Sequence, residues 1–273
     1  MITTNMKIGK VILAGAGPGD PELITLKALK YLQRADVILT DRLASPALLE
    51  EYAHPKANVV YVGKQCSKGV HTPQTDINQL MVHYASQGLL VVRLKGGDAS
   101  LFSNILDELK VLKEYHIAYE IIPGISAAFG ASAYTGIPLT ARGYARGLRL
   151  LTLYDINSVS EACWNEWCGT EDTLVFYMSG QKIVDLAKKF NHLNIDNTKM
   201  MAIVEQATTS EQSTTIFDFR DLERIEKYTF QFVPTLIIVG KVVNLHSEYA
   251  WKEEINETSS YFDHHKINMS HAV

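Results

Sequence analysis

The chain has 273 residues, of which 47% are hydrophobic and 21% are charged, and these proportions are typical of an ordinary globular protein. Its net charge of −4 and its pI near 6.1 provide no overall attraction to nucleic acid or to an anionic membrane. No apolar stretch approaches the ~20 residues of a membrane-spanning helix, and the N-terminus shows no signal-peptide pattern. The three cysteines include no Cys-x-x-Cys pair, so they indicate reduced thiols and a cytoplasmic protein, not a disulfide framework or a zinc site.

Short apolar runs alternate with helical patterns along the chain, which is typical of α/β proteins. Strands are expected at 10–14, 35–40, 58–62, 89–94 and 119–122, and then at 148–154, 173–177, 200–204, 214–219 and 235–240. Helices are expected near 23–32, 72–86, 103–115, 126–134, 159–167 and 181–190. We therefore predict two α/β domains with mixed or parallel sheets and a ligand cleft between them. Their expected bounds are 1–123 and 124–252, followed by a loose polar tail over 253–273.

The first strand leads into a glycine-rich turn, Gly15-Ala16-Gly17-Pro18-Gly19-Asp20. A helix start follows, with Asp20 as N-cap and Pro21 at the first helical position. Such a turn brings bare backbone close to whatever lies at the carboxyl end of the strand. It does not suit a nucleotide phosphate, because Asp20 replaces the third glycine of the dinucleotide pattern and Pro18 removes an amide donor. A tight turn with no ligand is the alternative.

Three further turns follow expected strands, at 40–43, 62–64 and 95–98. Ligands of open parallel sheets bind at the carboxyl ends of strands, so we expect the four turns to converge. Gly96 and Gly97 leave no side chain between backbone and ligand, and Asp98 could accept from ribose hydroxyls or attract a cation. Asp41 could instead hold a dinucleotide ribose, or form a surface ion pair with Arg42.

Six segments resemble the uroporphyrinogen-III C-methyltransferases, which are class III tetrapyrrole methylases: 11–26, 35–43, 60–64, 91–98, 122–140 and Tyr177-Met178. The resemblance extends over residues 10–251. It implies two α/β domains in a homodimer, with S-adenosylmethionine in the cleft and S-adenosylhomocysteine as the product. The implied reaction is methylation of uroporphyrinogen III to precorrin-2 through precorrin-1, on the way to sirohaem or cobalamin.

The resemblance also assigns residues, and it requires no metal. It implies that Asp41 is the proton acceptor and that Lys64 is the proton donor. The residues implied for the methyl donor are Pro18, Gly96, Gly97, Asp98, Leu101, Ser126, Ala127, Met178 and Ala207. The candidates for holding the substrate carboxylates are Arg42, Lys64, Lys68, Arg93, Lys95, Arg142 and Arg146.

The chain departs from the family pattern at several positions. Ala207 stands where the family usually has glycine, and 141–145 and 152–154 also differ. Residues 99–108 replace a glycine-rich stretch, and Asn104 stands where the family has arginine. We expect a continuous helix there, with Ser103 as N-cap and with Leu106, Leu109 and Leu112 on its buried face.

Three other functions stay open at this stage. One is a class III methyltransferase that acts on a later precorrin, and another is an impaired domain that still binds the methyl donor. The third is a nicotinamide-dependent oxidoreductase that uses the opening turn, which Asp20 and Pro18 disfavour.

Overall fold

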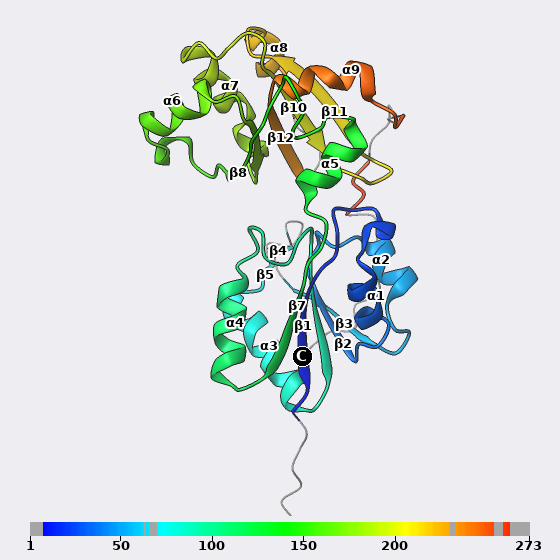
Figure 1. Cartoon of the computed structure of the whole chain (residues 1–273). Helices are drawn as coiled ribbons and strands as arrows, with labels where there is room; N and C mark the ends of the chain where they lie inside the picture. The colour runs from blue at the N-terminus through cyan, green and yellow to red at the C-terminus, as the bar shows by residue number, and fades with distance from the viewer. Residues whose placement is uncertain (1–7, 63, 66–69, 230–232, 254–258, 263–273) are drawn as a thin grey trace, which may run out of the picture. The chain divides into compact units, whose positions relative to one another are not determined.

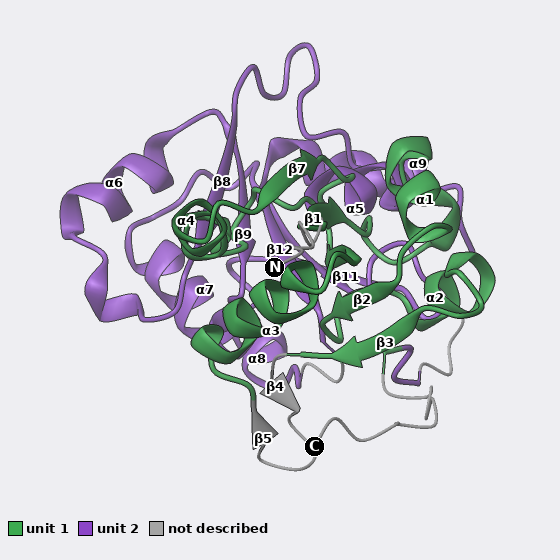
Figure 2. Ribbon diagram, turned by 90° about the horizontal axis from the view of Figure 1, so that it is seen from below, with its two compact units in different colours: residues 1–127, 262–273 green, residues 128–261 purple. Residues whose placement is uncertain are grey.

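The structure of the chain is a computed structural model. It describes residues 8–62, 64–65, 70–229, 233–253 and 259–262, with the backbone alone at 64, 65, 70 and 71. The chain divides into two compact units, one of residues 1–127 with 262–273 and one of residues 128–261 (Figure 2). Each unit contains one five-stranded sheet. Lys64 thus has a described backbone only, and most of the expected tail, 253–273, lies outside the described residues.

The sheet of the first unit is wholly parallel and follows the order β3-β2-β6-β1-β7. Its strands are β1 (Lys10–Gly15), β2 (Val37–Thr40), β3 (Asn58–Tyr61), β6 (Leu90–Lys95) and β7 (Ala118–Ile122). The interior strand β1, which lies between β6 and β7, is an apolar run whose residues 11–14 have no exposed surface. A strand of this kind is stable only where helices cover both faces of the sheet.

Helices cover both faces of this sheet, as Figure 1 shows. Helices α1 (Leu26–Leu32) and α2 (Pro46–Tyr52) pack on one face, where Ile12 and Ala14 point. Helices α3 (Gln74–Ser86) and α4 (Ile105–Glu114) pack on the other face, with Val11 and Leu13. This division follows from the period of two along a strand. The short strands β4 (Lys64–Gln65) and β5 (Val70–His71) form a separate antiparallel pair.

The expected helix start at Asp20 forms in two steps. Asp20 accepts a hydrogen bond from the amide of Glu22 at 2.9 Å and caps a 3-10 turn, η1 (Pro21–Leu23). Thr25 then caps α1 by accepting from the amide of Ala28 at 3.3 Å. Both caps satisfy amides that have no partner within the turn or helix that follows.

The sheet of the second unit is mixed and follows the order β11-β10-β12-β9-β8. Its strands are β8 (Leu148–Thr152), β9 (Thr173–Tyr177), β10 (Met200–Glu205), β11 (Ser213–Asp218) and β12 (Thr235–Gly240). Only β8 and β9 pair in parallel. Helices α6 (Glu161–Gly169), α7 (Ile183–His192) and α8 (Leu222–Glu226) pack on one face of this sheet through a core of aromatic side chains. The unit also contains α9 (His246–Tyr249), the 3-10 turns η2 (Ile156–Ser158), η3 (Gly180–Lys182) and η4 (Lys241–Leu245), and all but the first residue of α5 (Ala127–Thr135).

The predicted fold class, two α/β domains with parallel and mixed sheets, is confirmed. Helices α2, α8 and α9 and the β4–β5 pair are short elements with weak periodicity, and the sequence pattern did not predict them. The domain bounds inferred from the sequence stay a prediction. Within the described ranges, no helix is long and apolar enough to cross a membrane.

Candidate functional site

The carboxyl ends of β1, β6 and β7 meet through bare backbone. Gly17 and Gly97 exchange two hydrogen bonds, from the amide of Gly17 to the carbonyl of Gly97 at 3.2 Å and in the reverse direction at 2.8 Å. A Cβ at Gly15 would lie 2.6 Å from the carbonyl oxygen of Gly97, and a Cβ at Gly124 would lie 2.3 Å from it. Side chains at either position would therefore separate the three strand ends. We call the backbone of these four glycines the glycine floor.

Gly96 and Gly97 have opposite surroundings. A Cβ on Gly96 would lie 2.5 Å from the Cβ of Leu43, so Gly96 is required for close packing of two loops. Gly97 has φ +68°, which favours glycine, and a Cβ there would meet nothing closer than the amide nitrogen of Ala127 at 3.7 Å. The next nearest atom is the Cα of Ser126 at 3.9 Å. The half-buried backbone of Gly97 thus has room for at least one further atom, beside two other predicted donor residues.

Asp98 holds the loop that contains these glycines. Its Oδ1 accepts from the amide and the hydroxyl of Ser100 at 2.8 and 2.6 Å, and its Oδ2 accepts from the amide of Gly124 at 2.9 Å. Burial opposes ionisation, but these hydrogen bonds outweigh it and hold the pKa of Asp98 below its usual value. A negative charge therefore lies beside the glycine floor, while three of the acceptor positions of Asp98 are used within the protein.

The other predicted residues of the first unit lie in the same set of loops. Pro18 is buried in the turn after β1, and Leu101 is half-buried in the loop after β6. The amide of Glu22 donates a hydrogen bond to the carboxylate of Asp20, so this amide is not available to bind a phosphate. The loops after β1, β6 and β7 thus bring together Pro18, Gly96, Gly97, Asp98, Leu101, Ser126 and Ala127.

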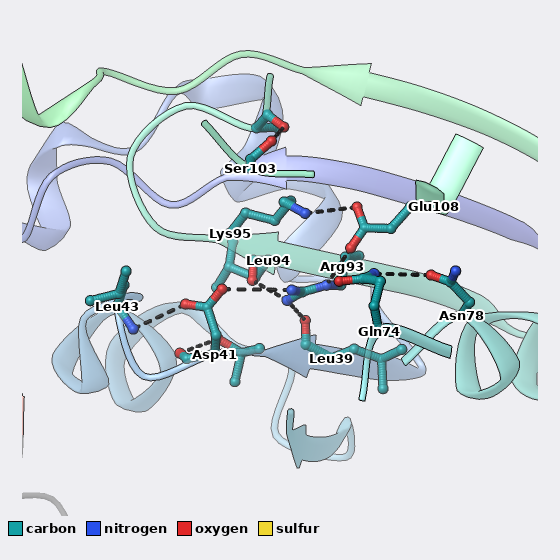
Figure 3. Close-up of polar contacts among 12 residues, drawn as sticks. Leu39, Asp41, Leu43, Gln74, Asn78, Arg93, Leu94, Lys95, Ser103 and Glu108 are labelled. Atoms are coloured by element: carbon teal, nitrogen blue, oxygen red, sulfur yellow. Dashed lines mark hydrogen bonds and ion pairs between the residues drawn. The ribbon is translucent and has the colours of Figure 1, made fainter. Parts of the chain in front are cut away.

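Asp41 lies directly after β2 and is held in a defined orientation. Its Oδ1 accepts from the amide of Leu43 at 3.0 Å, and its Oδ2 lies 3.6 Å from a guanidinium nitrogen of Arg93 (Figure 3). A quarter of the side chain is exposed, so the carboxylate can reach a ligand. The expected ion pair with Arg42 is not among the contacts that the structure gives Asp41. The side chain of Lys64, the other predicted catalytic residue, lies outside the described part of the structure.

Three buried charges lie behind Asp41, on the face of the sheet that α3 and α4 cover. Glu108 has no exposed surface and accepts from Nε of Arg93 at 3.1 Å and from Nζ of Lys95 at 2.8 Å. Burial lowers the pKa of Lys95, and the charge of Glu108 opposes that shift. Arg93 and Lys95 are therefore internal, and they are not surface candidates for substrate carboxylates.

The sequence analysis missed Glu108. An Asp-Glu pair early in a helix usually lies on a solvated face, and the carboxylate of Asp107 is indeed exposed. The spacing nevertheless contained the signal, because Glu108 is three residues after Ile105 and four before Leu112. Those three positions share one helical face, and Leu112 is fully buried.

The helix expected from Ser103 begins later than predicted, and one of the three leucines expected on its buried face, Leu106, is exposed. Helix α4 begins at Ile105, and its N-cap residue is Asn104 in the left-handed conformation, with no side-chain capping bond. The hydroxyl of Ser103 instead donates to the carbonyl of Ala99. Leu106 is 67% exposed, because the buried face of α4 contains Glu108 and Leu112. Leu112 is fully buried and Leu109 packs against the same core, as predicted.

Two predicted donor residues lie at one edge of the sheet in the second unit. Met178 follows β9 and Ala207 follows β10, and both strands end beside the start of β12. Tyr154 lies at a position where the sequence departs from the family pattern. Its hydroxyl donates a hydrogen bond to the sulfur of Met178. Ala207 is buried between two left-handed residues, Gln206 and Thr208, but is not left-handed itself. An alanine is therefore tolerated where the family usually has glycine.

Most of the non-glycine residues with a left-handed backbone lie in the candidate loops. Sequence patterns did not predict these conformations. Seven are found in the described ranges, and two of them, His116 and Asn194, end helices in the ordinary way. The other five lie in the loops after β6, β9 and β10: Phe102, Asn104, Met178, Gln206 and Thr208. Backbone strain of this kind is concentrated at functional sites. Over the same ranges, no group of three His, Cys, Asp or Glu side chains has the arrangement of a metal site.

The close approach at Gly124 generates a stability prediction. Gly124→Ala forces a Cβ to within 2.3 Å of a backbone oxygen, which cannot move without breaking the Gly17–Gly97 pair. The variant should lose ~1–3 kcal/mol of unfolding free energy in denaturant titrations. Gly169→Ala is the matched control, because a Cβ there meets nothing within 4 Å. Equal stability of the two variants would contradict the close approach.

Comparison with known proteins adds to this geometry. The family model of the tetrapyrrole (corrin/porphyrin) methylases matches residues 10–223. A siroheme synthase of Vesicomyosocius okutanii is 39% identical over 91% of this chain and 53% of its own length. The chain thus spans about half the length of the curated relatives it matches.

Solved structures match over nearly their whole length. Uroporphyrin-III C-methyltransferase of Thermus thermophilus, complexed with S-adenyl homocysteine, has a TM-score of 0.72 and 32% identity. That match covers 87% of this chain and 100% of the other. A cobalt precorrin-4 methyltransferase has a TM-score of 0.73 and 26% identity over 86% of this chain and 95% of its own.

Proposed function

Because the chain belongs to the tetrapyrrole (corrin/porphyrin) methylase family, we propose that it transfers methyl groups from S-adenosylmethionine to ring carbons of uroporphyrinogen III. The product is precorrin-2, formed through precorrin-1, on the way to sirohaem or cobalamin. The observation that carries the proposal is the open backbone of Gly97 beside the ionised Asp98. Such a surface suits a ligand with a positive sulfonium and no phosphate.

The loops after β1, β6 and β7 fit the methyl donor. The open backbone of Gly97 admits a ligand, and the carboxylates of Asp20 and Asp98 disfavour phosphate, as in NAD or ATP. When bound, S-adenosylmethionine supplies an electrophilic methyl group on a positively charged sulfur. The residues proposed to hold it are Pro18, Gly96, Gly97, Asp98, Leu101, Ser126, Ala127, Met178 and Ala207, of which Asp98 acts mainly by holding the loop.

Asp41 is proposed to remove a proton from the methylated macrocycle. Methylation of a ring carbon that already carries a side chain leaves a positive charge on the macrocycle. The macrocycle loses this charge by releasing a proton from another position, and a carboxylate in reach of the substrate can accept that proton. The amide of Leu43 occupies Oδ1 of Asp41, and Oδ2 is left for this task. Lys64 is proposed as the proton donor, on the strength of its position after β3 and of the family resemblance alone.

The acceptor has one specific rival. The match to a cobalt precorrin-4 methyltransferase has a TM-score of 0.73, so the fold does not separate a later precorrin from uroporphyrinogen III. Sequence identity favours uroporphyrinogen III, because this chain is 32% identical to the uroporphyrin-III C-methyltransferase and 26% identical to the cobalt precorrin-4 methyltransferase. An impaired domain that binds the donor without turnover is the second alternative, and a product assay separates it from both.

We propose a homodimer in the cytoplasm. The edge strand β7 exposes two large apolar side chains, Tyr119 and Ile121, on one face of the sheet. An apolar run of this kind on a sheet edge is suited to contact with a second copy. Cys163 and Cys168 are free thiols, as in a reducing compartment.

The function is tested by incubating the protein with S-adenosylmethionine and enzymatically made uroporphyrinogen III. We expect the acceptor to gain the mass of two methyl groups and the absorbance of precorrin-2. Asp41→Asn should lower kcat by ~10²–10⁴-fold, the usual contribution of a positioned base, with unchanged affinity for S-adenosylhomocysteine. No methylated product from the wild type would contradict the proposed function. Full turnover by Asp41→Asn would place the base elsewhere.

The donor site is tested by calorimetry with S-adenosylhomocysteine. Gly97→Ala fills the open space over the glycine floor, so it should weaken binding roughly tenfold, or ~1.4 kcal/mol. Gly88→Ala is the matched control, because Gly88 has φ +84° and brings the same backbone strain at a turn before β6. Equal affinities of the two variants would show that Gly97 does not contact the donor.

Light scattering tests the proposed assembly. We expect a mass near twice the 30.5 kDa of one chain, and a shift towards the single-chain mass in Ile121→Lys, which places a charge on the exposed face of β7. The control is Leu106→Lys on the exposed face of α4. A wild type with the mass of one chain would contradict the dimer.

A further inference from the structure

Glu108 is a charged residue with no exposed surface, and both of its oxygens are used (Figure 3). Oε1 accepts from Nε of Arg93 at 3.1 Å, and Oε2 accepts from Nζ of Lys95 at 2.8 Å. The carboxylate of Asp41 lies 3.6 Å from Arg93, so the cluster contains two carboxylates and two cations. We propose that Glu108 is a positioning residue that acts through Arg93 on the carboxylate of Asp41. This inference rests on the proposed function of Asp41.

The register between β2 and β6 explains why the four charged residues lie on one face of the sheet. Leu39 of β2 is the partner of Arg93 of β6. Residues two apart in an extended chain point to the same face, so Asp41 lies on the side of Arg93 and Lys95. Helix α4 packs on that face and brings Glu108 to both cations.

The guanidinium of Arg93 donates hydrogen bonds to three acceptors through Nε and Nη1, and its third nitrogen, Nη2, faces Asp41. Nη1 donates to the carbonyls of Leu39 at 3.3 Å and Leu94 at 2.9 Å, and Nε donates to Glu108. The remaining contact, from Nη2 to Oδ2 of Asp41, is 3.6 Å long, which is an ion pair but not a hydrogen bond. Within the described residues, Oδ2 therefore has a positive neighbour and an unused lone pair.

This arrangement suits a base that must accept a proton. A bidentate pair with arginine would engage both oxygens of a carboxylate. Glu108 draws the guanidinium towards α4 and so keeps it from closing on Asp41. Without the charge of Glu108, the nearest remaining acid for Arg93 is Asp41, so the guanidinium should turn and take Oδ2. Proton removal would slow, but binding of the donor and the acceptor would not change, because Glu108 has no exposed surface.

The test is steady-state kinetics of Glu108→Gln in the full chain. We expect kcat to fall roughly a hundredfold, as for a misplaced catalytic group, with the KM of both substrates within about twofold of the wild type. In an Asp41→Asn background, Glu108→Gln should cost less than about threefold in kcat, because the base it positions is already absent. A loss of the same size in that background, or a loss that appears in KM, would overturn the proposal.

A matched control makes the same chemical change outside the site. Glu120 accepts from Lys10 at 2.6 Å and also pairs with Lys27, so it too lies between two cations of the first unit. It lies in the middle of β7, where it pairs with Ile12 and accepts a hydrogen bond from Tyr31 of α1, on the opposite face of the sheet from Glu108. Glu120→Gln should therefore leave kcat within about twofold of the wild type. An equal loss in Glu120→Gln and Glu108→Gln would mean that loss of an ion pair in this unit is enough, and would contradict a specific role for Glu108.

Two further arms keep the proposal testable. If Glu108→Gln does not fold, Glu108→Asp keeps the charge, withdraws it by one methylene, and should show the same dependence on Asp41. A wild type without methyl transfer would contradict the proposed function, and a crystal structure of Glu108→Gln then decides this proposal alone. The proposal requires Nη2 of Arg93 within ~3.2 Å of Oδ2 of Asp41 in that variant, and a distance unchanged from the wild type overturns it.

Discussion

The structure of the site depends on the contact between bare backbones at the carboxyl ends of β1, β6 and β7. Gly15 and Gly124 approach Gly97 so closely that a Cβ on either would lie 2.3–2.6 Å from the carbonyl oxygen of Gly97, and Gly17 exchanges two hydrogen bonds with Gly97. Since three strand ends meet there without side chains, the next residues form loops over a flat backbone surface. Asp98 then fixes these loops, because its carboxylate joins Ser100 to Gly124. The space for a ligand and the fixed position of the loops therefore both follow from the close contact of the glycine backbones.

A second constraint is the set of charges inside the α3–α4 face of the same sheet. Buried ions are costly unless every one of them is paired, and the pairs here extend from Lys95 through Glu108 and Arg93 to Asp41. An apolar set of the same volume would pack at least as well, so stability does not explain why charges are present. A role in orienting the partly exposed carboxylate of Asp41 at the end of the set does explain it.

The fold and much of the site could be predicted from the sequence, for physical reasons. Apolar runs of four to seven residues predicted the strands, and the turns after them, which contain glycine or an acidic residue, predicted that Pro18, Asp41 and Gly97 lie at the same end of one sheet. Other features depend on contacts between distant residues, which no local pattern contains. The anchoring role of Asp98 required knowing that Gly124 lies beside it, and the start of α4 depends on a left-handed Asn104. Glu108 had the right helical spacing, but its acidic neighbour Asp107 made a solvated face the simpler interpretation.

The central claim is that the backbone around Gly97 is the surface on which the methyl donor lies. An experimental structure of the protein with S-adenosylhomocysteine tests it most directly. The account predicts that the ligand lies against the backbone of residues 96–98, with Ser126 and Ala127 beside it and with the hydrogen bonds of Asp98 to Ser100 and Gly124 intact. A ligand bound elsewhere, with the backbone of Gly97 still open, would contradict it.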